Sequence, residues 1–274
     1  MNFLGAIAVV LSVFGFALTY NLLRKRRLSF RLVFLLGFAV LAVPSFLFAV
    51  YYLHILPERA WFYTLRSWTG TEFLVIFLGC ATAAVASLLP RFLLGVPLFA
   101  LLALGVVPYL KPLIGPLPDS VFCELWQGDI CLQSTPSTCG PASVTTILRR
   151  LGAQTSERAT ARAAFSYTGG TEAWYLARYV RSQGFVPRFD FQRTFSPSVG
   201  VPAVVGVRLG GVGHFIAVLD ITDDQVTFAD PLSGQKHVAL SQFQHSYEFT
   251  GFHMVISNAM TATPNCRTSP HCPQ

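Results

Sequence analysis

The chain has 274 residues, of which 53% are hydrophobic and only 12% are charged, a composition that favours a membrane protein over a soluble one. Its formal net charge of +7 comes almost entirely from residues 1–119, which carry nine Lys or Arg against three Asp or Glu, while residues 120–274 carry eleven against ten. A nearly neutral second half offers no basic surface for a phosphate backbone, so we exclude nucleic acid as a partner.

Four apolar stretches fill most of the first 110 residues, roughly 3–23, 33–56, 73–89 and 92–110. Each is long enough to cross a bilayer. The alternative for the first stretch is a signal peptide, but its basic cluster, at residues 24–27, follows the apolar run, which is the reverse of a signal's order. We therefore expect an all-α transmembrane region of four helices over residues 1–110, with the small-residue run 80–87 packed inside the bundle.

The basic residues between these stretches predict their orientation. The link between the first and second stretches, residues 24–31, holds five basic residues, and the link between the third and fourth holds Arg91. The link between the second and third holds only Arg59 and Arg66. Because loops rich in Lys and Arg stay in the cytoplasm, both termini are expected outside. The sequence thus predicts an integral, multi-pass protein of the inner (cytoplasmic) membrane, in contact with the lipid bilayer, whose C-terminal half is periplasmic or extracellular.

A linker is expected over residues 111–122, because KPLIGPL (111–117) contains two prolines and a glycine and favours a loop over more helix. Cys123 and Cys131 flank a short acidic loop, and Cys266 and Cys272 close a polar tail over residues 259–274. In an oxidising compartment each pair could form a small-loop disulfide, and unpaired thiols are the alternative. Cys266, His271 and Cys272 lack a fourth zinc ligand nearby, so we expect no metal and no cofactor.

The remaining segment, residues 123–258, has helical patterns first and extended patterns afterwards. Apolar spacing, capping residues and terminal glycines predict helices over 140–151, 156–164 and 171–183. Short runs rich in Val, Ile and Phe predict strands at 201–209, 214–221, 225–229, 236–240 and 252–257. This order without βαβ alternation predicts an α+β domain with helices packed on an antiparallel sheet.

The sequence QSTPSTCGPAS (133–143) carries the chemistry. Cys139 precedes a Gly-Pro helix start, where the helix dipole favours the thiolate, the nucleophilic form. Gln133, six residues earlier, can place its amide beside the backbone N–H of Cys139 as an oxyanion hole. An inert buried thiol is the alternative for Cys139, and the role of Gln133 rests on spacing alone.

A base and an orienting carboxylate are predicted further along. Among the histidines outside the membrane region, only His214 follows a glycine-rich run (GGVGH) and opens an apolar strand. Asp230 should end the neighbouring hairpin strand, from which its carboxylate can orient the imidazole. A structural histidine and a common turn residue before proline are the alternatives.

The order Gln-x5-Cys-Gly, Gly-His-Phe and Asp-Pro resembles the bacteriocin-processing cysteine peptidases, which are papain-like and cut double-glycine leader peptides. The resemblance covers about 125 residues, and it implies a Cys139, His214 and Asp230 triad with Gln133 in the oxyanion hole. Thr138 replaces the acidic residue usual in transporter-linked members, and no GxxxxGK[ST] ATP-binding motif is present. The resemblance therefore implies a stand-alone, membrane-anchored relative without the transporter's ATPase.

Three functions are compatible with these residues. The first is cleavage of a peptide or protein substrate, such as a leader or precursor peptide, outside the membrane. The second is a catalytically silent domain that binds peptides or an unknown partner in a membrane complex of secretion or the envelope. The third is amide transfer by the same triad, which differs from hydrolysis only in the acceptor. A pure binder has no need of a thiol, an imidazole and a carboxylate together, which favours an enzyme.

Overall fold

A computed structural model describes residues 2–52, 55–192, 194–222 and 224–258. The chain divides into two compact units. The first contains the residues up to Leu117 together with Phe165–Gly169, and the second contains the other residues from Pro118 onward. The expected tail, with the predicted Cys266 and Cys272 pair, lies outside the described residues.

The first unit is helical throughout. Its α-helices are α1 (Phe3–Leu23), α2 (Leu28–Tyr52), α3 (Ala60–Arg66), α4 (Val75–Leu88), α5 (Gly95–Leu101) and α6 (Val107–Ile114). Short 3-10 turns, Thr71–Leu74 and Arg91–Leu93, precede α4 and α5. Among the described residues, three helices are long and apolar enough to cross a membrane: Phe3–Leu23, Leu28–Phe48 and Thr71–Leu88. The first three expected spans are thus present as helices, whereas the fourth apolar stretch is not one regular helix.

The fourth stretch is interrupted by a π-helical segment, Leu102–Val106, between α5 and α6. Helix α6 then runs to Ile114 with Pro112 inside it, so the expectation that the linker begins at Lys111 is wrong. A proline removes one helical hydrogen bond but does not end a helix that packing supports. Here Pro112 is buried, and Tyr109 packs with Ala8 of α1 and Val75 of α4.

Small residues let α1 and α4 approach each other closely. A Cβ on Gly79 would lie 2.3 Å from the backbone oxygen of Ser12, a distance that no side chain can occupy. The hydroxyl of Ser12 also donates to the carbonyl oxygen of Val75 at 2.8 Å. The small-residue run at 80–87 therefore lies inside the bundle as expected, with Ala83 and Ala84 fully buried.

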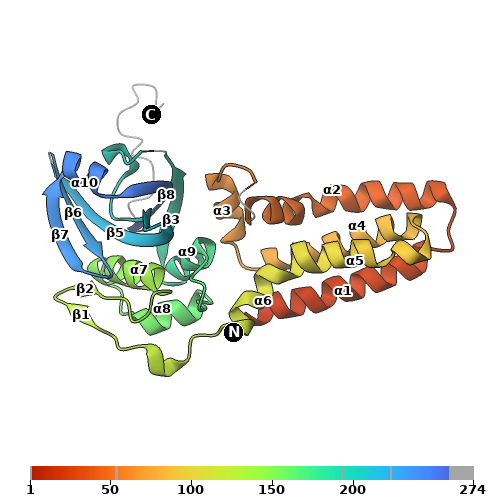
Figure 1. The fold of residues 1–274 in the computed structure, drawn as a ribbon, viewed down its shortest axis with the longest axis horizontal. Helices are drawn as coiled ribbons and strands as arrows, with labels where there is room; N and C mark the ends of the chain where they lie inside the picture. The colour runs from red at the N-terminus through yellow and green to blue at the C-terminus, as the bar shows by residue number, and fades with distance from the viewer. Residues whose placement is uncertain (1, 53–54, 193, 223, 259–274) are drawn as a thin grey trace, which may run out of the picture. The chain divides into compact units, whose positions relative to one another are not determined.

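The second unit is an α+β domain, as the sequence predicts. A short hairpin, β1 (Trp126–Gln127) and β2 (Ile130–Cys131), precedes helices α7 (Cys139–Arg150), α8 (Glu157–Ala163) and α9 (Ala173–Ser182). The strands are β3 (Phe185–Phe191), β4 (Ala203–Leu209), β5 (Val212–Thr222), β6 (Gln225–Asp230), β7 (Gly234–Ala239) and β8 (Glu248–Asn258), with α10 (Leu240–Ser246) before β8. They form one antiparallel sheet in the order β3-β8-β4-β5-β6-β7. Figure 1 shows α7, α8 and α9 on one side of this sheet and α10 on the other.

The three helices and five strands expected in this domain are confirmed within a few residues, but the β1–β2 hairpin, β3 and α10 are additional. Strand β3 contains Pro187, which lacks an N–H for strand pairing. It is tolerated because β3 lies at the edge of the sheet and pairs only with β8. Helix α9 begins at Ala173 after Glu172, so Thr171 is not its N-cap as expected.

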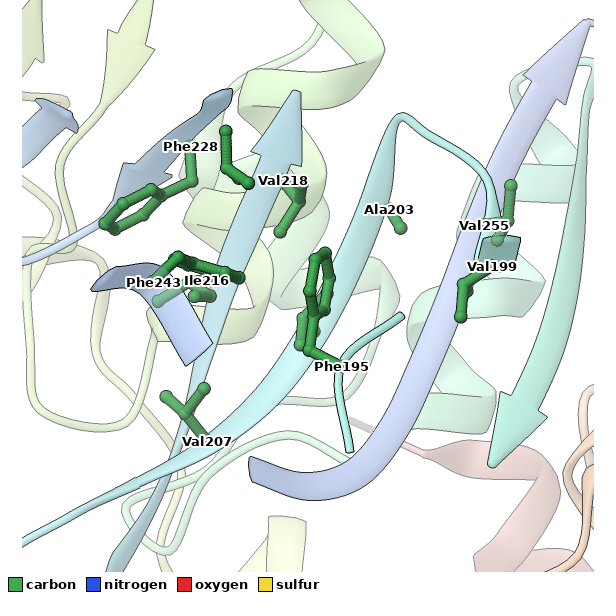
Figure 2. Close-up of a cluster of buried hydrophobic side chains, with 11 residues drawn as sticks. Phe195, Val199, Ala203, Val207, Ile216, Val218, Phe228, Phe243 and Val255 are labelled. Carbon is green, nitrogen blue, oxygen red and sulfur yellow. The ribbon is translucent and has the colours of Figure 1, made fainter. Parts of the chain in front are cut away.

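One hydrophobic cluster of the domain lies between the sheet and the segments on the side of α10. Figure 2 shows Phe195 and Val199, which precede β4, and Phe243 of α10 gathered with side chains of the strands. The buried members of this cluster are Phe195, Val199, Ala203, Val205, Val207, Ile216, Val218, Val226, Phe228, Phe243 and Val255. Alternate residues of β4, β5 and β6 therefore fix the register of the strands that carry the candidate site.

The expected disulfide between Cys123 and Cys131 is not formed, since both are free thiols. The hairpin register explains the absence, because Trp126 is the residue opposite Cys131. The backbone N–H of Cys123 instead bonds the hydroxyl of Ser134 at 2.9 Å, and its side chain is exposed. Cys131 is buried, and burial raises the pKa of its thiol.

Candidate active site

Cys139 is the first residue of α7 and is buried, with 8% of its surface exposed. The loop before it is held by Thr138, whose hydroxyl accepts from the backbone N–H of Thr135 at 3.1 Å and donates to the carbonyl oxygen of Thr135 at 3.0 Å. A sulfur at this position lies at the positive end of the helix dipole, which stabilises a thiolate. The position therefore suits a nucleophile.

Gly140 and Ser143 fix this helix against the strand that carries His214. A Cβ on Gly140 would lie 2.8 Å from Leu176 Cδ1 and 3.2 Å from Phe215 Cδ2, so the helix approaches β5 as closely as it does because the residue is glycine. One turn later, the Ser143 hydroxyl donates to the carbonyl oxygen of Phe215 at 3.1 Å. The residue next to Cys139 and the residue next to His214 are thus in contact.

His214 lies near the start of β5, and Asp230 ends β6. Because Ala217 pairs with Ala229, the alternation of side chains puts His214 and Asp230 on the same face of the sheet. Nε2 of His214 lies 3.0 Å from Oδ1 of Asp230, and both side chains are almost fully buried. The imidazole is therefore held by the carboxylate in a single orientation.

The thiol of Cys139 lies close enough to His214 to act on the pKa of the imidazole. Burial of the ring acts to lower the pKa of His214, but the hydrogen bonds to Asp230 and Cys139 outweigh it and raise this pKa to about 9. Asp230 behaves oppositely: burial opposes its charge, but hydrogen bonds from His214 and Leu232 hold the pKa of its carboxyl below the usual value. The pair is thus an imidazolium facing a carboxylate at neutral pH, with Nδ1 left for the sulfur.

Gln133 lines the same cavity as His214, and one N–H of its amide is held by a neighbouring carbonyl oxygen. Its Nε2 donates to the carbonyl oxygen of Thr135 at 2.8 Å, which leaves the second N–H of the amide for another acceptor. Its backbone N–H bonds the carbonyl oxygen of Pro231, the residue after Asp230, at 3.0 Å. The loop that carries Gln133 is therefore anchored directly beside the end of β6.

The other histidines are occupied elsewhere in the described chain. His237 bonds the hydroxyl of Thr227 at 2.8 Å, and His245 bonds the carbonyl oxygen of Ser241 at 2.6 Å. His253 is buried in β8 with Nδ1 3.0 Å from the carbonyl oxygen of Gly251, and burial lowers its pKa. Among the described residues, no group of three His, Cys, Asp or Glu side chains is arranged to hold a metal ion.

Two residues that support the site carry no sequence signal that we recognised. The Tyr247 hydroxyl donates to Oδ2 of Asp230 at 3.1 Å, on the carboxylate oxygen that His214 does not use. Glu157 of α8 is fully buried and accepts from the backbone N–H of Ser134 at 2.7 Å and from the Ser134 hydroxyl, so it holds the loop after Gln133. Neither residue lies near the cysteine motif in the sequence, and each reaches the site only through the tertiary fold.

A cavity of about 360 Å³ opens beside these groups. It is lined by Gln133, Ser134, Thr135, Pro136, Leu209, Val212, Gly213, His214 and Leu232. The glutamine loop forms one wall, and the tip of the β4–β5 hairpin with Leu232 forms the other. The cavity thus places open space next to the imidazole and the amide.

Comparison with known proteins covers the second unit. Residues 127–261 match the Peptidase C39 family. An uncharacterised protein of Methanothermobacter marburgensis is 32% identical over 133 residues, which are 46% of this chain and 87% of that protein. The probable functional amyloid protease FapD of Pseudomonas aeruginosa is 28% identical over 124 residues, which are 42% of this chain and 55% of FapD, so the match spans about half of that relative.

Solved structures include similar domains. The peptidase domain of Streptococcus ComA, described as a bi-functional ABC transporter of a quorum sensing pathway, is 19% identical. The match covers 46% of this chain and 96% of that domain, with a TM-score of 0.40.

Proposed function

The chain belongs to the Peptidase C39 family of cysteine peptidases, with a papain-like second unit, and we propose that it cleaves a peptide bond with Cys139 as nucleophile, His214 as acid and base, and Asp230 as the residue that orients His214. The observation that carries this proposal is the position of His214, whose Nε2 lies 3.0 Å from Oδ1 of Asp230 and whose pKa is raised by both Asp230 and Cys139. A thiol, an imidazole and a carboxylate in a line are the requirements for thiolate catalysis.

The proposed reaction has two halves. The Cys139 thiolate attacks the carbonyl carbon, and the negative charge on the carbonyl oxygen is stabilised by the backbone N–H of Cys139 and the free N–H of the Gln133 amide. The imidazolium of His214 then protonates the leaving nitrogen as the C–N bond breaks, which leaves a thioester on Cys139. A water molecule attacks the thioester, the neutral imidazole takes its proton, and release of the acid restores the starting pair.

The test is a set of single substitutions assayed by peptide cleavage and by labelling with a thiol-directed electrophile. Cys139→Ala should abolish cleavage and the labelling of residue 139 while the fold is kept, because alanine fits the same helix start and removes only the reactive sulfur. His214→Ala should be nearly as severe, and Asp230→Asn milder, since it misorients the base without removing it. Gln133→Ala should raise the barrier by about 2.7–4 kcal/mol, the cost of one oxyanion-hole donor.

The matched control is Cys123→Ala, because Cys123 is an exposed thiol whose hydrogen bonds go to Ser134 and Val121 and not to the candidate site's histidine. It should keep full cleavage activity. Persistent cleavage by the Cys139→Ala protein, or loss of activity on substitution of His237, His245 or His253 instead of His214, would contradict the assignment. Absence of both labelling of Cys139 and cleavage of any peptide would favour the silent, peptide-binding alternative.

The apolar helices support a membrane-anchored enzyme, and the basic links support a peptidase domain outside the cytoplasmic membrane. The likeness to FapD, named as a probable functional amyloid protease, suggests an amyloid-forming polypeptide as one class of substrate. Such a polypeptide would meet the domain after it has crossed the membrane. Cleavage of an exported reporter peptide by intact cells, and its loss in cells that carry Cys139→Ala, is the corresponding measurement.

A further inference from the structure

One wall of the cavity beside His214 is made of apolar side chains that are exposed and are not needed for the packing of the fold. Val212 is 71% exposed and Leu232 is 58% exposed, although both are large apolar side chains. Val212 is paired with Leu209 across a two-residue turn made by Gly210 and Gly211, which have φ values of +56° and +84°. A tight hairpin of this kind requires left-handed glycines. The turn therefore places the side chains of Leu209 and Val212 at the mouth of the cavity.

The two hydroxyl groups on the opposite wall are already engaged, while the Gln133 amide keeps polar capacity there. The Ser134 hydroxyl donates to Glu157, and the Thr135 hydroxyl accepts from the backbone N–H of Ser137 at 3.2 Å. Among the nine lining residues, His214 is the only one that can carry a charge. A cationic side chain in this cavity would face the His214 imidazolium, and an anionic one would lose hydration while that imidazolium is already paired with Asp230.

The catalytic roles define which part of a substrate reaches this cavity. After attack, the acyl half of the peptide stays on the Cys139 sulfur, while His214 must lie within hydrogen-bond reach of the leaving nitrogen to protonate it. The cavity is lined by His214 and Gln133, and Cys139 is not among its lining residues. A side chain inside it thus lies beyond the imidazole from the sulfur, on the leaving side of the bond.

We propose that this cavity receives the side chain of the residue directly after the cleaved bond, and that Leu209, Val212 and Leu232 select an apolar one. The inference rests on the proposed function, since it uses His214 as the acid. A volume of about 360 Å³ lies near the lower end of the roughly 300–1,000 Å³ range of ligand pockets, which suits a single side chain of a peptide.

The test uses the full chain in detergent and a library of peptides made by digesting a bacterial proteome. New amino termini that appear with the wild-type protein but not with Cys139→Ala identify cleavage sites. Their first residues should be enriched in Leu, Ile, Val and Phe and depleted in Asp, Glu, Lys and Arg. For one cleaved peptide resynthesised with Leu or Asp after the bond, kcat/KM should favour Leu on the order of tenfold, the discrimination expected of a small apolar pocket.

Val212→Asp should weaken the preference for apolar residues and raise cleavage before Lys and Arg, because it places an anion at the cavity mouth. The control is Val186→Asp, which changes an exposed apolar residue of β3 that does not line the cavity and should leave the preference unchanged. Cleavage that depends on Cys139 but shows no apolar preference, or a preference that Val212→Asp leaves intact, would overturn this inference while the proposed function stands. A library with no Cys139-dependent termini would overturn both.

Discussion

His214 links the two ends of the candidate site, and its protonation should control the pH dependence of activity. Its pKa is raised to about 9, whereas the pKa of Asp230 is lowered. The imidazolium that the leaving group needs is therefore present at neutral pH and is lost as the pH rises through about 9. We expect kcat/KM to fall on the alkaline side near that pH, as measured by a pH–rate profile.

The same raised pKa makes a matching contribution to stability. A histidine with a folded-state pKa above its unfolded value of about 6.5 stabilises the fold fully below that pH and loses this contribution as the pH rises through about 9. Asp230→Asn removes the main partner that raises the pKa of His214. The alkaline limb of the pH–rate profile of this variant should therefore move toward lower pH. An unchanged limb in this variant would show that Asp230 does not set the protonation of His214.

We expect Tyr247 to be a positioning residue, because its contact with the proposed triad is through Asp230. Its hydroxyl donates to Oδ2 of Asp230 at 3.1 Å, and loss of a hydrogen bond to a charged group costs about 1.5–3 kcal/mol. Tyr247→Phe should lower kcat more than it changes KM, since the substrate is not contacted. It should also shift the acid limb of the pH–rate profile upward, because that hydrogen bond helps to lower the pKa of Asp230.

The control for this prediction is Tyr179→Phe. The Tyr179 hydroxyl hydrogen-bonds Thr155 at 2.5 Å within the helical layer and has no part in the site. This variant should lose stability to chemical denaturation without a shift of the acid limb. An acid limb that stays fixed in Tyr247→Phe as well would reduce Tyr247 to a structural role.

The sequence predicted the residues whose chemistry and local context both stand out. A cysteine before Gly-Pro predicted a helix start and a histidine after a glycine-rich run predicted a strand start, and α7 begins at Cys139 and β5 at Val212. His214 and Asp230 lie 3.0 Å apart, while the catalytic roles of the three residues stay a prediction. Tyr247 and Glu157 could not be found in this way, because a tyrosine before a strand and a glutamate in a short helix are ordinary residues. Their roles depend on distances across the folded domain.

At the scale of elements, the contact between α7 and β5 decides whether nucleophile and base meet. Gly140→Ala should destabilise the domain by about 1–3 kcal/mol, since the added Cβ would meet Leu176 at 2.8 Å and Phe215 at 3.2 Å. It should also lower activity, because a displaced α7 moves Cys139 away from His214. Unfolding in denaturant and the rate of electrophile labelling measure the two effects.

Gly213→Ala is the matched control, because a Cβ there would meet nothing within 4 Å and its backbone does not require a left-handed conformation. Its stability should stay close to that of the wild type. Equal stability of both variants would mean that α7 has room to move and that the glycine in the Cys-Gly pair is not a packing requirement.

Periodicity located the regular elements but not those whose formation depends on neighbours. Helix α7 has an apolar stripe and a clear start, and it could be predicted within one residue. Strand β3 was missed because Pro187 argues against a strand unless the strand lies at an edge, which only the sheet order reveals. The Cys123 and Cys131 disulfide was expected from spacing alone, and the register of the hairpin, which spacing does not give, excludes it.

For the whole molecule, the helical unit has two ends of different charge. Arg31 donates to the carbonyl oxygens of Arg24, Arg26 and Ser87 at 2.6–2.8 Å, so the basic link after α1 and the end of α4 lie together. Arg66, from the second link, is buried against the ring of Phe48, with its guanidinium carbon 4.2 Å from the ring centroid. Because Arg66 is buried, the end of the bundle that carries the second link exposes less positive charge than its sequence contains. The excess of exposed positive charge at the other end is therefore larger than the sequence alone suggests.

The path of the fourth apolar stretch bears on the number of crossings. Leu94, Leu98 and Leu101 pack beside Phe16 and Tyr20, near the end of α1. Tyr109 packs beside Ala8, near its start. The stretch thus runs antiparallel to α1 along much of its length, despite the π-helical segment that keeps it from being one regular helix.

If α1 crosses the membrane, a segment that runs the same length beside it should cross as well, and the second unit should lie outside the cytoplasm. A reporter that is active only outside, fused after Leu117, should therefore be active, and the same reporter fused after Arg27 should be silent, because that link carries most of the positive charge. The two fusions control each other, since they use one reporter on opposite ends of the bundle. Activity after Arg27 together with silence after Leu117 would place the peptidase unit in the cytoplasm. A fourth stretch that does not cross would silence both fusions, because the chain would then return to the cytoplasm after α4 and remain there.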